Sequence, residues 1–209
     1  MTAAPAIAAV AFDVGETLVD ETRSWQAAAD RAGVPRLTLL AALGGLIARG
    51  EPHDRVWALV GAERPGELPA PAADALYPDA LPALRALRAA GVRLAAAGNM
   101  PAAFEAVVRE HVDVVGSSAR WGVAKPDPAF FARLAAELGL PPGRVAYVGD
   151  RIDNDVRGAR AAGMRAVHLR RGPWALLHPD DAAADVVVDS LLQLPGALGL
   201  DPPREFRNP

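Results

Sequence analysis

YVGDRIDNDVRGARAAGM, residues 147–164, is the stretch that decides the fold of this chain. It begins within an apolar run at 145–148, and that run stops at a glycine followed by Asp150. A short apolar run bounded in this way is typical of a buried parallel strand ending in a loop. A helix is then predicted over 153–162, closed by a glycine. The stretch therefore predicts a strand, a loop and a helix, with Asp150 after the strand and Asp155 one turn into the helix.

The rest of the chain repeats this alternation of strands and helices. Further apolar runs of the same form predict strands over 7–12, 92–97, 112–115, 166–169 and, more weakly, 186–188. Helices are predicted over 79–90 and from Asp127-Pro128, an N-cap acid with proline at the first helical position, to Gly139. Alternating strands and helices predict an α/β fold, with a Rossmann-like parallel sheet, right-handed crossovers and helices on both faces.

One segment, residues 19–76, interrupts the alternation because it contains no convincing strand. Helices are predicted there over 21–32, 36–49 and 54–60, followed by a proline-rich connector over 64–73. An all-helical insert directly after the first strand predicts a small cap over the carboxyl edge of the sheet. The expected organisation is a core of residues 1–18 and 77–200, a cap of residues 19–76, and a loosely ordered, proline-containing tail at 201–209.

Composition excludes several classes of protein. The chain has 209 residues, a net charge of −3 and a pI near 5.8, so no basic surface indicates nucleic acid or an anionic membrane as a partner. It contains no cysteine, which excludes disulfides, zinc knuckles and thiol nucleophiles. The apolar N-terminus has no positive region and ends at Asp13, too soon to span a bilayer. We therefore expect a cytoplasmic protein, either monomeric or homodimeric.

Polar residues follow several of the predicted strands. Asp13, Asn99, Lys125 and Asp150 all fall at or just beyond strand ends, and Asp155 can point back from the following helix. Ligands bind outside the carboxyl ends of the strands in open parallel sheets. Three crowded carboxylates repel one another, and a hard cation removes that cost. Oxygen-only ligands suit Mg²⁺ rather than Zn²⁺, so the pattern predicts a magnesium site.

Each of these residues also has a simpler interpretation when taken alone. An acid after a strand is more often an N-cap or a turn former than a ligand, and that applies to Asp127 and also to Asp153. Lys125 could be a solvated loop lysine. The combination favours a site because one acid ends the first strand and a Gly-Asp-x₄-Asp pattern follows the fourth.

Three motifs resemble those of the haloacid dehalogenase superfamily of aspartate-nucleophile hydrolases. They are AFDVGETLVDE (11–21), AKPDPAFF (124–131) and the stretch at 147–164, and the insert at 19–76 takes the position of that family's helical cap. The resemblance implies that Asp13 is a nucleophile that forms a phosphoaspartyl intermediate and that Lys125 neutralises it and the phosphoryl group. It also implies that Asp13, the Gly15 carbonyl and Asp150 bind Mg²⁺, with Asp155 binding it directly or through water. Phosphoryl transfer depends mainly on positioning and charge neutralisation, so these roles are physically reasonable.

The chain departs from the family pattern at Gly15, where phosphatases usually carry a second aspartate as general acid and base. Such a group commonly contributes roughly 10²–10⁴-fold in rate. Its loss leaves a leaving group that needs no proton, an acid supplied from elsewhere, or weak activity. The adjacent Glu16 is better explained as a solvated loop acid, and the other candidates are Glu21, Glu51, His53 and Asp54.

The chain also departs from the family pattern at Gly98, where the family has a serine or threonine that hydrogen-bonds a phosphoryl oxygen. Asn99 or the backbone N–H groups of its loop could replace that hydroxyl, although a turn or helix-capping role for Asn99 is equally well supported. Thr17 is implied to support the first loop by hydrogen bonding. These three residues complete the expected phosphate-binding set.

Three functions remain in competition. The first is a magnesium-dependent hydrolase of a small phosphorylated metabolite, and the second is a binding or regulatory protein that has lost catalysis. The third is a 2-haloacid dehalogenase, which would need no metal and would use a cap arginine, for which the sequence offers Arg23, Arg31 and Arg36. Of the other conspicuous residues, Trp121 could line the pocket, whereas Trp25 and Trp57 are expected to be core or interface residues. The histidines His111, His168 and His178 show no metal-ligand spacing and are expected to be structural or exposed.

Overall fold

The computed structural model describes residues 6–66 and 70–200, and it confirms the predicted α/β class. Six parallel strands form one sheet in the order β3-β2-β1-β4-β5-β6. Their bounds are β1 (Ala9–Phe12), β2 (Arg93–Gly98), β3 (Val114–Ser117), β4 (Val145–Gly149), β5 (Arg165–Leu169) and β6 (Val186–Val188). Each predicted run became a strand, and the largest shifts are at β1 and β3, which each begin two residues later than their apolar runs.

The sheet order brings distant parts of the chain together. β1 lies between β2 and β4, and Phe12 is paired with Val148 in the register of the β1–β4 ladder. Asp13 and Asp150, which follow these two strands, therefore emerge side by side at the carboxyl edge. The chain winds outward from β1 in opposite directions, first through β2 and then through β4. Such a reversal of strand order opens a crevice at that edge, which is where ligands bind in α/β sheets.

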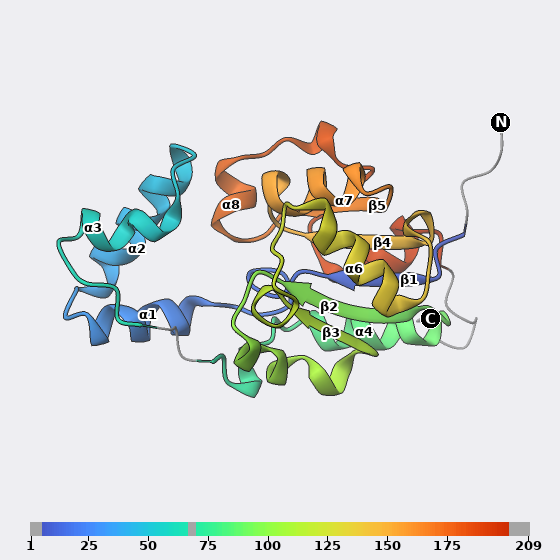
Figure 1. Ribbon diagram of the computed structural model, residues 1–209, viewed down its shortest axis with the longest axis horizontal. Helices are drawn as coiled ribbons and strands as arrows, with labels where there is room; N and C mark the ends of the chain where they lie inside the picture. The colour runs from blue at the N-terminus through green and yellow to red at the C-terminus, as the bar shows by residue number, and fades with distance from the viewer. Residues whose placement is uncertain (1–5, 67–69, 201–209) are drawn as a thin grey trace, which may run out of the picture.

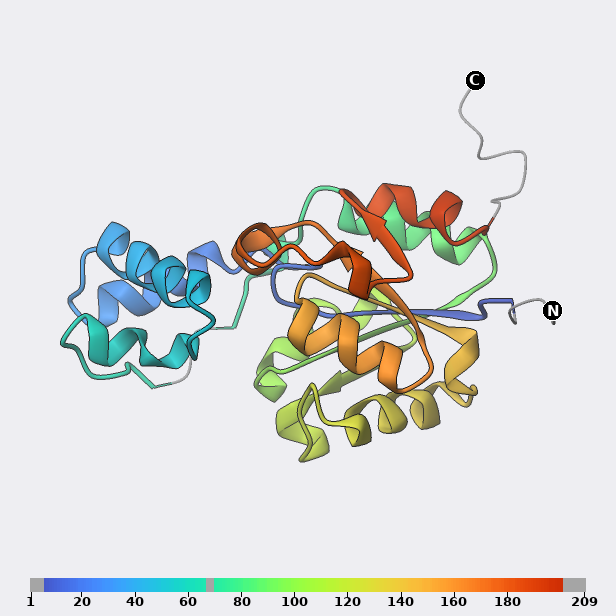
Figure 2. The same ribbon diagram turned by 90° about the horizontal axis from the view of Figure 1, so that it is seen from above.

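Helices cover both faces of the sheet (Figure 2). On one face lie α4 (Ala80–Ala89) and α9 (Leu194–Ala197), and on the other α6 (Pro128–Leu138) and α7 (Arg157–Ala161). Because both faces are covered, the two hydrophobic clusters of the core include every residue of β1. The remaining short helical segments are α5 (Ser118–Trp121), α8 (Gly172–Leu177), η2 (Ala73–Ala75), η3 (Ala102–Val107), η4 (Arg109–His111), η5 (Pro142–Arg144), η7 (Asp181–Ala183) and η8 (Leu191–Gln193).

Of the helix starts predicted at Asp127 and Asp153, the first is confirmed and the second is not. Asp127 caps α6 as expected, because its carboxylate accepts a hydrogen bond from the Ala129 N–H at 2.8 Å. The helix predicted over 153–162 instead begins as a π-helical turn, η6 (Ile152–Val156), before α7. Asp153 is not an N-cap there and forms an ion pair with Arg151 at 2.7 Å. π-turns recur at functional sites because they redirect a side chain, and this one carries Asp155.

The helical insert lies beyond the carboxyl edge of the sheet (Figure 1). It comprises α1 (Thr22–Arg31), α2 (Arg36–Ala48), η1 (His53–Arg55) and α3 (Val56–Leu59), so the helix predicted over 54–60 starts as a 3₁₀ turn. The insert has its own apolar cluster, built around Trp25, Trp57, Leu39, Leu43 and Leu46. Its two connections to the core lie side by side, since the Asp20 N–H donates to the Ala75 carbonyl at 2.9 Å. This pairing supports the proposed cap of residues 19–76.

The helix α8 was not predicted from the sequence. It connects the core with the insert through side-chain contacts. It packs against α2, and Trp174 joins the apolar cluster of the insert. His178, at the end of α8, is hydrogen-bonded to the Ile47 carbonyl in α2. Core and insert are therefore connected through α8 as well as through the chain itself.

Within residues 6–66 and 70–200, no single helix combines the length and apolar composition needed to cross a membrane, although α1 and α2 together, bent by 117°, satisfy both measures. The loosely ordered tail predicted at 201–209 and part of the connector predicted at 64–73 lie outside the described residues.

Candidate active site

Three buried carboxylates converge at the carboxyl edge of the sheet. Asp13 follows β1, Asp150 follows β4, and Asp155 points back from the π-turn. One carboxylate oxygen from each lies within 4.8 Å of the other two. The residues are only 8, 1 and 0% exposed, respectively. Buried charges this close require compensation by cations, so the cluster is electrostatically incomplete without positive charge.

Two glycines permit the close approach of these acids. A Cβ atom at Gly149 would lie 2.4 Å from the carboxyl carbon of Asp155, and one at Gly98 would lie 2.5 Å from Asp13 Oδ1. Both separations are well inside van der Waals contact. Serine or threonine at position 98 would therefore clash with the Asp13 carboxylate, which occupies the space beside Gly98.

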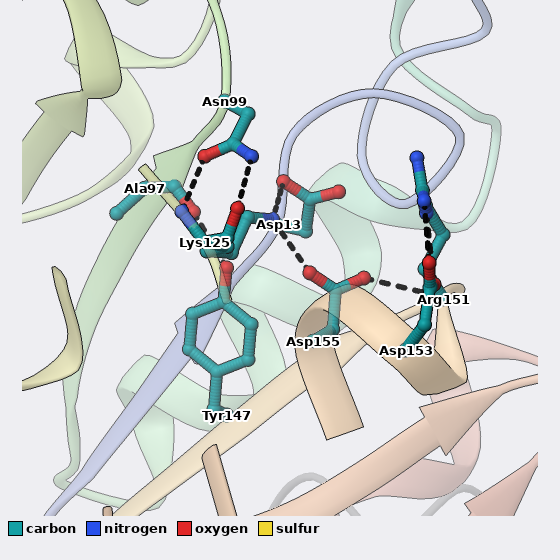
Figure 3. A network of polar contacts seen from close by, with 8 residues as sticks. All are labelled: Asp13, Ala97, Asn99, Lys125, Tyr147, Arg151, Asp153 and Asp155. Atoms are coloured by element: carbon teal, nitrogen blue, oxygen red, sulfur yellow. Dashed lines mark hydrogen bonds and ion pairs between the residues drawn. The ribbon is translucent and has the colours of Figure 1, made fainter. Parts of the chain in front are cut away.

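Lys125 supplies one of the required positive charges. Its ammonium lies 2.6 Å from Asp13 Oδ1 and 2.5 Å from Asp155 Oδ1, bridging the two carboxylates (Figure 3). Burial alone would lower the pKa of Lys125, but the negative charges of Asp13 and Asp155 outweigh that effect and hold the pKa well above its usual value. The lysine is 4% exposed and stays charged, so the interpretation of Lys125 as a solvated loop residue is wrong.

Asn99 holds the Lys125 loop in place. Its side-chain amide donates to the Lys125 carbonyl at 2.9 Å, and its side-chain oxygen accepts from the Lys125 N–H at 2.8 Å (Figure 3). Neither the turn role nor the phosphate-donor role predicted for Asn99 describes this pair of bonds. Asn99 instead fixes the backbone from which the lysine side chain reaches the acids.

Asp150 is the member of the cluster with an unsatisfied atom. Its Oδ2 is buried and has no hydrogen-bond partner among the described residues. Burial, with the neighbouring charges of Asp155 and Asp13, raises the pKa of Asp150 well above its usual value. For Asp155 the same burial raises the pKa to about 6, although the Lys125 charge opposes the rise. An orphaned oxygen beside two more carboxylates fits a hard divalent cation that takes oxygen ligands.

We expect Asp150→Asn to stabilise the metal-free protein. Asparagine keeps the shape of the side chain but removes a buried charge that folding must desolvate, so the free energy of unfolding should rise by about 1–2 kcal/mol. The same change should abolish the stabilisation conferred by excess magnesium chloride. Thermal unfolding of both proteins, with and without the salt, measures each effect.

Asp153→Asn is the matched control for that comparison, because Asp153 lies in the same segment but is exposed. Loss of a mainly solvated ion pair should change stability by no more than about 1 kcal/mol and should leave the magnesium response intact. Equal magnesium stabilisation of Asp150→Asn and the wild type would contradict the assignment of Asp150 to a metal site.

A pocket of about 350 Å³ separates these acids from the helical insert. The core contributes Asp13, Gly98, Lys125 and Asp150 to its lining, among others, and the insert contributes Glu21, Trp25, His53, Trp57 and Arg64. Trp25 and Trp57 are stacked with their ring centroids 6.5 Å apart, which gives the pocket an aromatic wall. The insert therefore encloses the space in front of Asp13.

Several pocket residues were not singled out from the sequence, among them Arg151 and Trp174. Arg151 lies against the face of Trp174, 5.1 Å from the ring centroid, and both line the pocket. Arg151 directly follows Asp150 in the strongest motif, so its position after a strand was an available signal. Trp174 follows β5 and a Gly-Pro pair, and it could have been recognised only by counting that loop among those at the carboxyl edge.

The first loop places its residues differently from the prediction. Glu16 is not a solvated acid, because its two carboxylate oxygens accept hydrogen bonds from the Glu21 N–H at 3.0 Å and the Tyr77 hydroxyl at 2.8 Å. Thr17 is fully buried and does not line the described pocket, and its hydroxyl has no partner among the described residues, so the expected hydrogen bond is not formed. Gly15 lines the pocket, and the role of its carbonyl remains a prediction.

Glu21 belongs to the same electrostatic neighbourhood. Burial, together with the charges of Glu16 and Asp13, raises the pKa of Glu21 to about 8. The Trp25 side chain hydrogen-bonds this carboxyl group. The pocket thus has an acidic group on the insert side as well as the acids on the core side.

Other candidates from the sequence lie outside the pocket. Trp121 packs on Phe130, with ring centroids 5.1 Å apart, and on Gly116, so the idea that it lines the pocket is wrong. His168 is buried with its Nδ1 3.1 Å from Asp181, in a structural position. None of the cap arginines considered for a dehalogenase lines the described pocket: Arg23, Arg31 and Arg36. Arg23 and Arg36 form exposed ion pairs within the insert and its connector, with Asp74 and Asp30.

The fold and the acid cluster together define a class of proteins with a parallel α/β core, an aspartate cluster at the carboxyl edge of the sheet and a helical insert after the first strand. The chain belongs to the haloacid dehalogenase-like hydrolase family, which it matches over residues 7–163. It is 39% identical over 121 residues to a glyceraldehyde 3-phosphate phosphatase of Methanopyrus kandleri, covering 54% of this chain and 52% of that protein. It is 36% identical over 127 residues to a phosphoserine phosphatase of Thermus thermophilus, covering 57% and 49%.

A solved structure agrees with the fold over nearly the whole chain. The HAD phosphatase of Thermococcus onnurineus superposes with a TM-score of 0.65 at 23% identity, covering 94% of this chain and all of that one. At this identity the likeness concerns the fold. The chain spans only about half the length of these curated relatives, so the family follows from the match over residues 7–163, and the relatives do not establish the activity of this chain.

Proposed function

We propose that this protein is a magnesium-dependent phosphatase that hydrolyses a small phosphorylated metabolite through a phosphoaspartyl intermediate on Asp13. The observation that carries the proposal is the convergence of the Asp13 carboxylate, the Lys125 ammonium and the Asp150 carboxylate at the floor of one capped pocket, with the Asp155 carboxylate buried beside them. A nucleophile, a fixed cation and a cation-binding set are the parts that phosphoryl transfer requires.

The residues present fit a bound Mg²⁺ ion. Asp13, Asp150 and Asp155 would hold it, together with the backbone carbonyl of Gly15, and the orphaned Oδ2 of Asp150 would gain a partner. Bound there, Mg²⁺ would supply positive charge to the phosphoryl oxygens and to the buried acids. The Lys125 charge alone cannot balance three carboxylates, which supports a second cation.

The chain's own residues would carry out the two displacement steps. Asp13 attacks phosphorus, and the bond to the leaving oxygen breaks as the aspartyl phosphate forms. Water then attacks phosphorus, releasing inorganic phosphate and restoring the carboxylate. Lys125 is held against Asp13 and stays charged, so it orients the nucleophile and balances charge on the transferring group.

The pocket favours a small substrate. It is enclosed by the insert, has a volume of about 350 Å³, and combines an aromatic wall with Arg64 and Arg151. A phosphate on the Asp13 side and a second anionic or polar group on the cap side would satisfy these features. The relatives named above are phosphatases of glyceraldehyde 3-phosphate and phosphoserine, both small phosphomonoesters. We propose a cytoplasmic location and a substrate of that size.

A panel of phosphorylated metabolites, assayed for phosphate release with magnesium and with a chelator, tests the proposal. At least one phosphomonoester should be hydrolysed with magnesium, and chelation should reduce the rate by about 10³-fold or more. Readdition of magnesium should restore it. Equal rates in magnesium and chelator would rule out the metal-dependent reaction.

The same panel, extended by 2-haloacids assayed for halide release, separates the two alternatives. A protein retained only for binding would show magnesium-dependent stabilisation with no turnover of any phosphate ester. A 2-haloacid dehalogenase would release halide in the presence of chelator. The structure gives the dehalogenase no added support, because Arg23 and Arg36 are paired at the surface of the insert and its connector.

A further inference from the structure

The space beside Gly15 is already filled by another acidic side chain. A Cβ atom built on Gly15 would lie 2.8 Å from the carboxyl carbon and Oε1 of Glu21, and 3.0 Å from its Oε2. A side chain at position 15 would therefore begin where the Glu21 carboxyl group lies. Position 15 is where family phosphatases usually carry their second aspartate, so the missing carboxylate is replaced in space by one from six residues later.

The Glu21 backbone is fixed by the loop that contains Glu16. The Glu21 N–H donates to Glu16 Oε1, and the Tyr77 hydroxyl donates to Glu16 Oε2. The Trp25 side chain hydrogen-bonds the Glu21 carboxyl group itself. Glu16 is thus engaged in holding the loop, whereas the Glu21 carboxyl group lines the same pocket as Asp13 and Lys125.

We propose that Glu21 is the general acid and base of the phosphatase reaction, an inference that rests on the proposed function. In the first step, the bond between phosphorus and the leaving oxygen breaks as Asp13 attacks, and that oxygen takes the proton of the Glu21 carboxyl group. In the second step, the Glu21 carboxylate takes a proton from the water that attacks phosphorus, and the bond between phosphorus and Asp13 breaks. Each proton and bond is then accounted for.

The other acids of the insert are less well placed. Glu51 is engaged by Arg49 at 2.6 Å and also pairs with Arg55. Asp54 lines the pocket but is exposed. Among the candidates in the described part of the insert, only Glu21 has its carboxyl group in the space that a side chain at position 15 would occupy.

The test compares the first release of leaving group from two substrates of similar size in Glu21→Gln. Benzyl phosphate leaves as an alkoxide that needs a proton, whereas 4-nitrophenyl phosphate leaves as a stable phenolate. In single-turnover experiments, release of benzyl alcohol should slow by about 10²–10⁴-fold, while release of nitrophenolate should change by less than about tenfold. With 4-nitrophenyl phosphate in excess over the enzyme, nitrophenolate should also appear as a burst of about one per active site, because the second step lacks its base.

Three further variants test the assignment. Asp20→Asn, an adjacent acid that does not line the pocket and whose Oδ1 accepts from the Thr22 N–H, should leave both release rates unchanged. Glu21→Ala should lose benzyl phosphate turnover, and adding Gly15→Asp to it should restore turnover by at least about tenfold, since the smaller residue at position 21 makes room for the new carboxylate.

Several outcomes would overturn the inference. Equal slowing of both leaving groups in Glu21→Gln would indicate that Glu21 only supports the loop. Undiminished release of benzyl alcohol would show that another group provides the proton. A wild-type protein that releases neither leaving group in magnesium would remove the proposed function, and this inference with it. Nitrophenolate release by the wild type with no burst in Glu21→Gln would keep the function and reject the role of Glu21.

Discussion

Asp13→Asn is expected to lower kcat/KM for any phosphomonoester by at least about 10⁴-fold, because the amide cannot act as the nucleophile. The variant should fold normally. It removes one of three buried carboxylates, and the Lys125 ammonium retains Asp155 at 2.5 Å as a partner. Phosphate release assays measure the loss of activity, and thermal unfolding checks that stability is not reduced.

Asp127→Asn provides a matched control for that variant. Asp127 is an exposed acid at the N-cap of α6, and asparagine caps a helix about equally well. Activity should therefore remain at the wild-type level in Asp127→Asn. If Asp13→Asn retained turnover comparable to the control, Asp13 could not be the nucleophile.

The second large effect is expected for Lys125→Met, which should lose both activity and stability. The lysine is 4% exposed and bridges two of the three carboxylates, so its removal leaves buried negative charge without its partner. Breaking a buried pair on one side typically costs about 3–5 kcal/mol. Denaturant unfolding of the metal-free protein measures this change, and magnesium should recover part of it.

A double-mutant cycle identifies the cause of that instability. Adding Asp13→Asn to Lys125→Met should restore stability by at least about 1 kcal/mol, because it removes one of the unpaired charges. A double variant no more stable than Lys125→Met would mean that lost packing against Phe130 and Tyr147, rather than charge, explains the effect. Unchanged stability of Lys125→Met would contradict the ion-pair network itself.

Much of the core could be predicted from local patterns. The six strands were recognisable because each contains a short apolar run, and the central strands β1 and β4 are buried along their whole length. The motif at 147–164 was informative because only glycine fits at position 149 beside the Asp155 carboxyl group. The glycine and the two aspartates of the motif therefore indicate the close approach of the strand end and the following helix. Asp127-Pro128 marked a helix start for an equally local reason, since it satisfies the first N–H groups of α6.

The parts that escaped prediction depend on contacts between distant segments. The role of Asn99 follows from two bonds to Lys125, 26 residues away. Trp174 reaches the pocket because α8 packs against α2, and no pattern near residue 174 indicates that contact. The π-turn at Ile152–Val156 was mistaken for an ordinary helix because hydrogen-bond spacing within a turn leaves little trace in residue types.

The sequence by itself determined which apolar segments form strands, where the helical insert lies and which acids follow the strand ends. These features can be read from residue type and spacing, because burial of a strand and capping of a helix depend on residues that are close together in the chain. Only the tertiary structure decided that Lys125 bridges Asp13 and Asp155 and that Glu21 fills the space beside Gly15. Such placements arise when the parallel crossovers and the insert fold back on one another, and the energies that fix them come from atoms far apart in the chain.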